Sequence, residues 1–368
     1  MRVPDIDTPA LLIDREIVLR NLQKMQNYAD AAGVSLRPHT KTHKMPYFAK
    51  LQESIGAAGI TVAKTGEAEV MAANGLKDIF IANEIVGELK FQRIIALLRA
   101  GINLSFGIDS IEQASLIERA FERSDTKACV LAEIEVGESR SGFVEKQDFA
   151  AFIKFIKGCK NIEFRGVFSH DGHSYKAACK SECERIHLAA QRRTLEFADI
   201  ARELALPARV VSIGSTPSLI NDFEILKGVT EIRPGTYIFM DASQAQAYGD
   251  YSMNAASILT TVISRPTADR IITDVGAKGL TQQKRTEGFT ATPGLGRIKG
   301  TDVWVNGVYD EHAIIYDRAL RDAVRVGDRL EIYPNHICPV VNLHEFAYLV
   351  SGGEVVEKIP VLCRGKLQ

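Results

Sequence analysis

The sequence is short of several features that would each define a class of protein. No apolar run approaches the ~18 uninterrupted residues of a membrane span, and the first residues contain no apolar segment of the secretory type. The six cysteines show no CxxC spacing, so a disulfide framework is not expected. A formal net charge of -1 gives no sign of a nucleic-acid or membrane partner. We therefore expect a cytoplasmic enzyme or binding protein.

The first two thirds of the chain alternate short β-rich runs with amphipathic segments, and the 368 residues suffice for two domains. Eight runs predict strands, at residues 34–41, 59–64, 78–83, 103–109, 128–135, 162–170, 209–216 and 231–239. The alternation predicts an α/β fold with an N-terminal (β/α)₈ TIM-type barrel, and an open doubly wound sheet is the alternative. The barrel is favoured because polar residues gather at the strand ends, which meet at one face of a barrel.

The pattern changes after about residue 245. Short strands separated by turn signals are predicted at residues 257–263, 270–274, 301–308, 312–316, 329–333 and 346–350. This region is expected to form a smaller, all-β domain.

The segment 37–44, Arg-Pro-His-Thr-Lys-Thr-His-Lys, concentrates basic side chains. Side chains alternate between the two faces of a strand, so Arg37, His39 and Lys41 would all point to one side of the first strand. Lys41 would stand last in this row, at the end of the strand, where a lysine can form a Schiff base. A solvated basic strand end is the simpler interpretation.

A lysine nucleophile needs a lowered pKa, given by burial or by neighbouring positive charge. We expect Arg37, His39 and His43 to provide that charge around Lys41. Lys44 and Lys64 are the rival lysines, but Lys44 lies past the predicted strand and Lys64 lacks the histidines.

Two glycine-containing loops, 212–217 and 233–237, follow or overlap the seventh and eighth predicted strands. In barrels this region often binds phosphate through backbone N–H groups and hydroxyls. Either loop alone is a common turn. Both loops together with a Schiff-base lysine predict pyridoxal phosphate. The candidate cofactor-binding residues here are Gly214, Ser215, Thr216, Gly235 and Thr236.

The run 334–339, Pro-Asn-His-Ile-Cys-Pro, contains a possible metal pair. In an extended chain His336 and Cys338 would share one face, and imidazole with thiolate suits zinc. Two protein ligands would leave an open, catalytic coordination site. The alternative is a buried apolar cysteine beside an ordinary loop histidine.

Four further residues at or after predicted strand ends are candidates. Arg140 could meet a cofactor anion, with a surface ion pair as the alternative. His170 and His173 are candidate metal ligands, acid–base groups or polar lining. Tyr175 could pack near a cofactor ring or donate a proton.

The segments 37–44, 59–71, 170–175, 212–217 and 336–345 together resemble the D-serine dehydratase and D-threonine aldolase family. These are fold-type III pyridoxal-phosphate enzymes, similar in architecture to alanine racemase, and the resemblance covers nearly the whole chain. It implies that Lys41 is the Schiff-base and catalytic lysine, that His39 helps to bind the cofactor, and that His336 and Cys338 hold the metal. It also implies a homodimer.

The opening segment 8–14 is similar to the family's first strand, which joins the C-terminal domain. The predicted domains are therefore a cofactor-binding barrel, 15–245, and a β domain, 1–14 plus 246–368, that carries the metal pair.

Within the family, a His-x-Asp pair resembles the aldolases and a His-x-Cys pair the zinc-dependent dehydratases, in keeping with the preference of soft thiolate for zinc. Cys338 thus favours a D-serine dehydratase that converts a D-β-hydroxy amino acid to a 2-keto acid and ammonia. D-threonine and D-threo-3-hydroxyaspartate are alternative substrates. A metal-dependent D-threonine aldolase and a non-catalytic pyridoxal-phosphate carrier are alternative functions. Asp171, where related sequences more often have a small residue, is expected to affect substrate preference or metal affinity.

Overall fold

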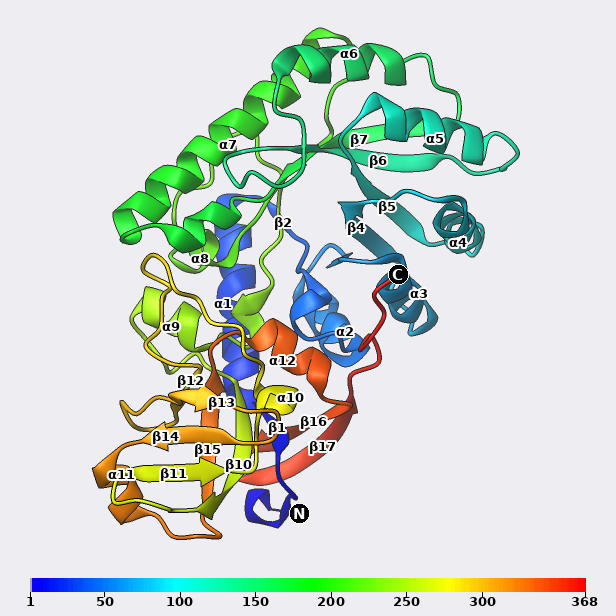
Figure 1. The fold of residues 1–368 in the computed structure, drawn as a ribbon. Coiled ribbons are helices and arrows are strands. Elements are labelled where there is room, and N and C mark those ends of the chain that lie inside the picture. Colours follow the sequence, from blue (N-terminus) through cyan, green and yellow to red (C-terminus); the bar gives the residue numbers. More distant parts are fainter. Residues whose placement is uncertain (1) are drawn as a thin grey trace.

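Residues 2–368 are described by a computed structural model, and they form two sheets, one of eight strands and one of nine. Figure 1 shows the second sheet beside the barrel, with helix α12 (Ile337–Leu343) between the two. This helix packs against the barrel segment that contains Lys41. No helix among residues 2–368 combines the length and apolar character that crossing a membrane requires.

The eight-stranded sheet is a closed parallel barrel. Its strands are β2 (Ser35–Leu36), β3 (Ile60–Val62), β4 (Asp78–Glu84), β5 (Asn103–Ile108), β6 (Ala128–Ile134), β7 (Ile162–Ser169), β8 (Val210–Ile213) and β9 (Glu231–Ile232). They pair in the order β2-β9-β8-β7-β6-β5-β4-β3. A parallel bridge between His39 and Thr61 closes the circle, together with a hydrogen bond from Thr61 N to Pro38 O of 2.8 Å. The predicted barrel is confirmed, and the open sheet is wrong.

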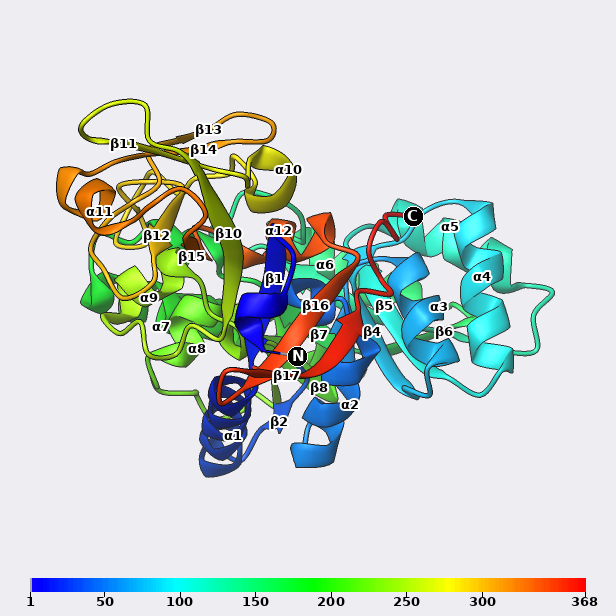
Figure 2. The same cartoon turned by 90° about the horizontal axis from the view of Figure 1, so that it is seen from below.

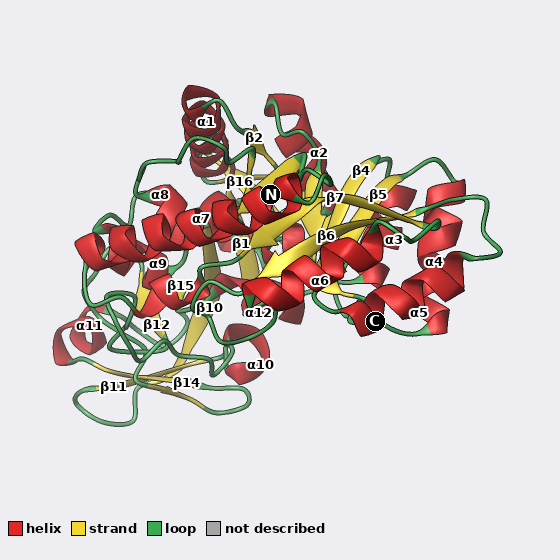
Figure 3. Cartoon of the chain, turned by 90° about the horizontal axis from the view of Figure 1, so that it is seen from above, coloured by secondary structure: helices red, strands yellow, loops and turns green. Residues whose placement is uncertain are grey.

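Helices alternate with these strands and lie outside them (Figure 3). They are α1 (Arg15–Ala32), α2 (Pro46–Ile55), α3 (Thr65–Ala73), α4 (Glu88–Arg99), α5 (Ile111–Phe121), α6 (Lys146–Ile156), α7 (Lys180–Glu203), α8 (Thr216–Ile220) and α9 (Ala242–Tyr248). Their apolar faces and the barrel interior form one continuous core. Strand β6 is buried along its entire length, as its largely apolar sequence predicts, and its one charged residue is Glu133.

The first and last predicted barrel strands are shorter than expected. Residues 34–41 contain only β2 followed by the turn η2 (Thr40–Thr42), and 231–239 contain only β9 followed by η4 (Thr236–Ile238). Each strand runs into a proline, Pro38 or Pro234, which has no N–H to donate to a neighbouring strand. Lys41 therefore lies on a turn beyond the strand rather than on its last residue.

The second sheet is mixed. Its strands are β1 (Ala10–Asp14), β10 (Ala256–Ser264), β11 (Arg270–Thr273), β12 (Gly296–Ile298), β13 (Gly307–Val308), β14 (Ala313–Tyr316), β15 (Arg329–Pro334), β16 (Phe346–Ser351) and β17 (Glu354–Pro360). The short helices α10 (Ala277–Leu280), α11 (Arg318–Ala323) and α12 accompany it. The C-terminal β domain is confirmed, but these helices were not predicted, and of residues 301–308 only β13 is a strand.

Strand β1 joins the two ends of the chain. It pairs antiparallel with β10 and parallel with β16, and Figure 2 shows it between them. Leu11 and Ile13 face the main core, whereas Ala10 and Leu12 face a second apolar cluster. Both faces are covered, so the strand is an unbroken apolar run. We keep the division into 15–245 and 1–14 plus 246–368 as a proposal.

Candidate active site

A cavity of about 340 Å³ opens at the carboxyl ends of the barrel strands. Active sites of this fold lie at that face. Nine of the residues predicted from the sequence line the cavity: His39, Lys41, Arg140, His170, Tyr175, Ser215, Thr216, Gly235 and Thr236. Gly214, His173, His336 and Cys338 lie outside its lining. The barrel thus brings together residues that are nearly 200 positions apart in the chain.

Lys41 extends into this cavity from the turn η2. Part of its surface is accessible, but that surface faces the cavity, and the enclosing protein still desolvates the amine. Burial lowers the pKa of Lys41, and the nearby cations Arg140 and Arg233 lower it further, while the neighbouring Cys338 opposes them. The direction of the shift favours a neutral amine, the form that can act as nucleophile or base.

The other basic residues of the segment 37–44 have structural partners. Arg37 Nε donates to Glu231 Oε2 at 2.6 Å, and Arg37 also pairs with Asp78. His43 is completely buried beside Gln52. These two are therefore not the neighbours of Lys41 that we predicted, whereas His39 is.

The rival lysines are absent from the cavity lining. Lys44 forms a buried ion pair with Glu67, with 2.6 Å between Nζ and Oε1. Lys64 precedes helix α3. Among the lysines of residues 2–368, only Lys41 lines this cavity.

The two glycine-containing loops contact each other at the end of the barrel. Gly235 N and Thr236 N donate to Thr216 Oγ1 at 3.3 and 3.1 Å. A Cβ atom at Gly235 would lie 3.0 Å from Thr42 Oγ1, so only glycine fits there without displacement. The carbonyl oxygen of Gly214 lies 2.7 Å from His170 Nδ1 and fixes that ring against the cavity, while its predicted contact with the cofactor stays a prediction.

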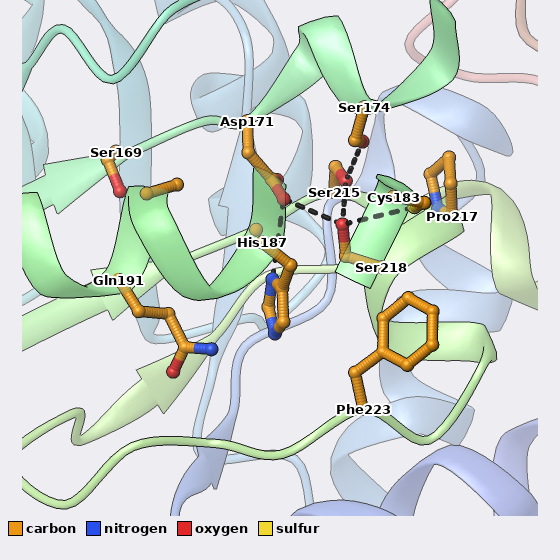
Figure 4. A network of polar contacts seen from close by, with 12 residues as sticks. Ser169, Asp171, Ser174, Cys183, His187, Gln191, Ser215, Pro217, Ser218 and Phe223 are labelled. Atoms are coloured by element: carbon orange, nitrogen blue, oxygen red, sulfur yellow. Dashed lines mark hydrogen bonds and ion pairs between the residues drawn. The ribbon is translucent and has the colours of Figure 1, made fainter. Parts of the chain in front are cut away.

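Asp171 is buried behind the first of these loops (Figure 4). Its Oδ2 accepts a hydrogen bond from Ser218 Oγ at 2.6 Å and lies 3.3 Å from His187 Nδ1. Ser218 Oγ is in turn 3.1 Å from Ser215 Oγ, which borders the cavity. Burial alone would raise the pKa of Asp171, but these contacts hold it well below its ordinary value. An ionised Asp171 therefore supports the Ser215 loop.

A pair of carboxyl groups from strands β4 and β6 also lines the cavity, and the sequence analysis did not predict it. Glu133 accepts from Arg140 Nη2 at 3.1 Å and from Ser141 Oγ at 2.8 Å. Glu84 lies beside Glu133, and burial and this contact raise the pKa of Glu84 to about 9. Burial alone would raise the pKa of Glu133, but the hydrogen bonds that Glu133 accepts lower it. Glu84 thus carries the proton and Glu133 the charge.

Arg233 is a second cavity residue missed from the sequence. Its guanidinium is buried, donates to Ser212 Oγ and to Ser169 O, and lies against the ring of Phe168. Burial lowers the pKa of Arg233 to about 10. Its position directly after the short strand β9 and before Pro-Gly was the available signal.

The sequence predicted an extended chain at His336 and Cys338, but the pair lies at the start of helix α12. His336 is the residue before the helix, and Cys338 lies in its first turn. Asp241 holds this helix end, because its Oδ2 accepts from Ile337 N at 3.1 Å and its Oδ1 caps α9 by accepting from Gln244 N at 2.8 Å. Cys338 Sγ lies 3.4 Å from Thr42 Oγ1, the residue after Lys41.

The electrostatics of the pair suit a metal ion. Burial lowers the pKa of His336 to about 4, so its imidazole is neutral at physiological pH, and His336 Nδ1 is buried with no hydrogen-bond partner. Burial also raises the pKa of the Cys338 thiol. Zinc prefers neutral imidazole and thiolate. No group of three or more His, Cys, Asp or Glu among residues 2–368 is arranged to hold a metal, so the pair would supply two ligands of an open site.

The cavity also fits pyridoxal phosphate. Its volume lies in the range of small-molecule sites, roughly 300–1,000 Å³. Lys41 stands on one side, and the contacting loops present the hydroxyls of Ser215, Thr216 and Thr236 beside Gly235.

A barrel with a lysine in its mouth and a second, mixed sheet defines a class of two-domain α/β enzymes. The family model described as "Alanine racemase, N-terminal domain" matches residues 13–243, and a serine dehydratase domain matches residues 255–350. The chain belongs to this alanine racemase-like family.

Among its relatives, a D-threonine aldolase of Arthrobacter sp. is 30% identical over 98% of this chain and 93% of its own length. The D-threo-3-hydroxyaspartate dehydratase of Delftia sp. (strain HT23) is 33% identical over 90% and 91%. Its solved structure superposes with a TM-score of 0.91 and covers 98% of both chains at 28% identity. A further structure of that dehydratase is a cysteine-to-alanine variant in the metal-free form, with a TM-score of 0.92, 28% identity and the same coverage.

Proposed function

We propose that this protein is a pyridoxal-phosphate- and zinc-dependent dehydratase of a D-β-hydroxy amino acid such as D-serine. One observation carries the proposal: helix α12 brings the thiol of Cys338 to 3.4 Å from Thr42, the residue next to the buried, cavity-facing Lys41. A lysine that activates Cα and a soft metal pair that faces the neighbouring carbon are the two elements that loss of a β-hydroxyl requires.

Lys41 is the proposed anchor of the cofactor and the base at Cα. When bound, pyridoxal phosphate supplies an electron sink for negative charge at Cα. Lys41 can take the Cα proton because burial and the charges of Arg140 and Arg233 favour its neutral amine. The cavity walls around Lys41 exclude bulk water, which strengthens these electrostatic effects.

The remaining cavity residues are proposed to hold the cofactor. Ser215, Thr216, Gly235 and Thr236 provide hydroxyl and backbone donors for the phosphate at the end of strands β8 and β9. His39, Arg140 and Tyr175 face the same cavity and would fix the ring. Arg140 is kept in place by Glu133, so both interpretations of this arginine, ion pair and cavity residue, hold together.

His336 and Cys338 are the proposed zinc ligands. Hydroxide is a poor leaving group, since the pKa of bulk water is about 15.7. A zinc ion held by this pair would stabilise, as a Lewis acid, the negative charge on the departing hydroxyl. The existence of a metal-free structure of a cysteine-to-alanine variant of a D-threo-3-hydroxyaspartate dehydratase supports this assignment. Departure of hydroxide from Cβ with loss of the Cα proton gives an enamine, which takes up water and releases ammonia to leave the 2-keto acid.

A D-threonine aldolase is the second candidate, because the Arthrobacter relative has that activity in its name. It would use the same scaffold but break the Cα–Cβ bond after loss of the hydroxyl proton. The thiolate of Cys338 argues for the dehydratase, since aldolases of the resembled family use a carboxylate there. A non-catalytic carrier needs neither the second sheet nor the metal pair.

A panel of D-amino acids scored for ammonia tests the proposal. We expect release of ammonia from D-serine, D-threonine or D-threo-3-hydroxyaspartate, and its loss after treatment with a chelator. Activity that is unchanged by the chelator would exclude the metal, and no activity on any member of the panel would favour the carrier. The homodimer and the cytoplasmic location stay predictions.

A further inference from the structure

Arg285 lies in the segment between α10 and β12 and connects the two sides of the proposed site. Its guanidinium stacks on Tyr175, with the Cζ atom 4.0 Å from the ring centroid. Tyr175 lines the cavity. The backbone of Arg285 is fixed on the other side, because Arg285 N donates to Asn335 Oδ1 at 3.1 Å. Asn335 is completely buried and directly precedes His336. Arg285 therefore lies between the cavity wall and the proposed metal pair.

The guanidinium of Arg285 is without a protein acceptor. Its Nε is buried with no hydrogen-bond partner, and within residues 2–368 it forms no ion pair. The nearby acidic groups are engaged elsewhere. Glu287 pairs with Lys176 at 3.0 Å, and both oxygens of Asp241 accept backbone N–H groups. A half-buried cation with free donors, held in place at a cavity, is suited to an anionic ligand.

The planar shape of the Arg285 guanidinium indicates that its ligand is a carboxylate. A guanidinium presents parallel N–H donors that match the two oxygens of a carboxylate, and stacking on an aromatic ring fixes its plane. Two arginines line the cavity: Arg233 donates to Ser212 and to the carbonyl of Ser169, and Arg140 pairs with Glu133 and is assigned to the cofactor. Arg285 lies outside this lining, against the ring of Tyr175, and its donors are available to a substrate.

The position of Arg285 indicates which carboxylate of the substrate it would contact. Its backbone is joined to the residue before His336, so it lies at the end of the site where the proposed metal pair faces Cβ. We propose that Arg285 recognises a carboxylate on Cβ, and that the preferred substrate is a dicarboxylic D-β-hydroxy amino acid of the D-threo-3-hydroxyaspartate class. This inference rests on the proposed function and deepens it, because D-serine has no such group.

The test compares Arg285→Leu with the wild-type holoenzyme on two substrates. For D-threo-3-hydroxyaspartate we expect kcat/KM to fall roughly 10- to 100-fold, the range for loss of a hydrogen-bonded charged contact. For D-serine we expect a change within about 3-fold, since no contact is lost. Arg285→Lys keeps the charge without the two-pronged geometry and should recover only part of the loss. Lys284→Leu removes a neighbouring exposed cation and should alter neither value.

A binding measurement separates this inference from the proposed function. D-aspartate has the second carboxylate but no hydroxyl to lose, and D-alanine has neither. By calorimetry, Arg285→Leu should weaken D-aspartate binding about 10-fold or more and leave D-alanine binding unchanged. Equal loss for both substrates or both ligands, or no loss for either, would overturn the role of Arg285. A wild-type protein that releases no ammonia but shows this selective binding would overturn only the proposed dehydration.

Discussion

The arginines around the site differ in how they are paired. On the barrel side, Arg37 has Glu231, Arg140 has Glu133, and the buried Arg233 has Ser212. On the C-terminal side, within residues 2–368, the guanidinium of Arg285 has no such partner, and neither has His336 Nδ1. The difference indicates that the protein itself holds the paired arginines, whereas Arg285 and His336 are available to a ligand.

Lys41 is the exception that supports this interpretation. It belongs to the barrel, but its amine faces the cavity and has no carboxylate partner among residues 2–368, unlike the neighbouring Lys44 with Glu67. An unpaired buried amine has a lowered pKa and is reactive. Groups with partners hold the site together, and groups without partners carry out the chemistry. The following variants test this division in order of expected effect.

Lys41→Ala should have the largest effect, because it removes the proposed anchor and base. We expect kcat to fall by ~10³-fold or more, within the range for a positioned base. Borohydride treatment followed by peptide mass spectrometry should find the cofactor on the Lys41 peptide of the wild type and on no peptide of the variant. Lys64→Ala is the control and should resemble the wild type. Cofactor fixed to another lysine in the Lys41 variant would refute the assignment.

Cys338→Ala removes one of two proposed metal ligands. We expect loss of bound zinc, measured by elemental analysis, and a fall in dehydration beyond the roughly 10–100-fold typical of outer-sphere changes at metal sites. The fold should be unaffected, because the thiol makes only long contacts with Thr42 and Thr236. Cys159→Ala, outside the cavity, is the matched control. Full zinc content in the Cys338 variant would remove the basis of the proposal.

Asp171→Ala tests the paired side. It leaves His187 and Ser218 buried without their partner, and each such group costs about 1–3 kcal/mol of unfolding free energy. Asp171→Asn can present one oxygen at the same place and should lose less. Arg285→Leu, on the unpaired side, should change the free energy by no more than about 0.5 kcal/mol. Equal destabilisation by the alanine variant of Asp171 and the leucine variant of Arg285, measured by denaturant unfolding, would abolish the distinction between the two sides.

Glu84→Gln should have its effect on the pH dependence of stability. In the folded protein the pKa of Glu84 is raised to about 9, so the folded state holds a proton that the unfolded state releases above pH ~4.5. The unfolding free energy of the wild type therefore falls as pH rises through this window. The variant lacks that term, and its Tm relative to the wild type should increase from pH 5 to pH 9. Glu88→Gln, at an exposed carboxyl, should show no such trend.

The sequence was sufficient to predict the barrel because its strands are buried on both faces and appear as apolar runs. Residues 128–135 were predicted as a strand and β6 is Ala128–Ile134. Lys41 and the loops at Ser215 and Gly235 could be placed at one face because parallel strands share a carboxyl end. The prediction failed for the lengths of two strands. Pro38 and Pro234 shorten β2 and β9, and the apolar pattern does not reveal this effect.

The C-terminal side was less predictable because its geometry depends on distant partners. Helix α12 begins directly after His336 because Asp241, almost one hundred residues earlier, accepts from Ile337 N. Asp171 faces Ser218 and not the neighbouring histidines, which no spacing rule indicates. Arg285 lies in an irregular segment, and only the fold brings it over Tyr175.

The products formed by the wild-type protein from D-threo-3-hydroxyaspartate test the central claim most directly. This substrate is common to both candidate reactions. Our account predicts oxaloacetate and ammonia in equal amounts, with neither formed after removal of zinc. Formation of glycine and glyoxylate in place of ammonia would contradict it, because the Cα–Cβ bond and not the bond from Cβ to the hydroxyl would then have been broken.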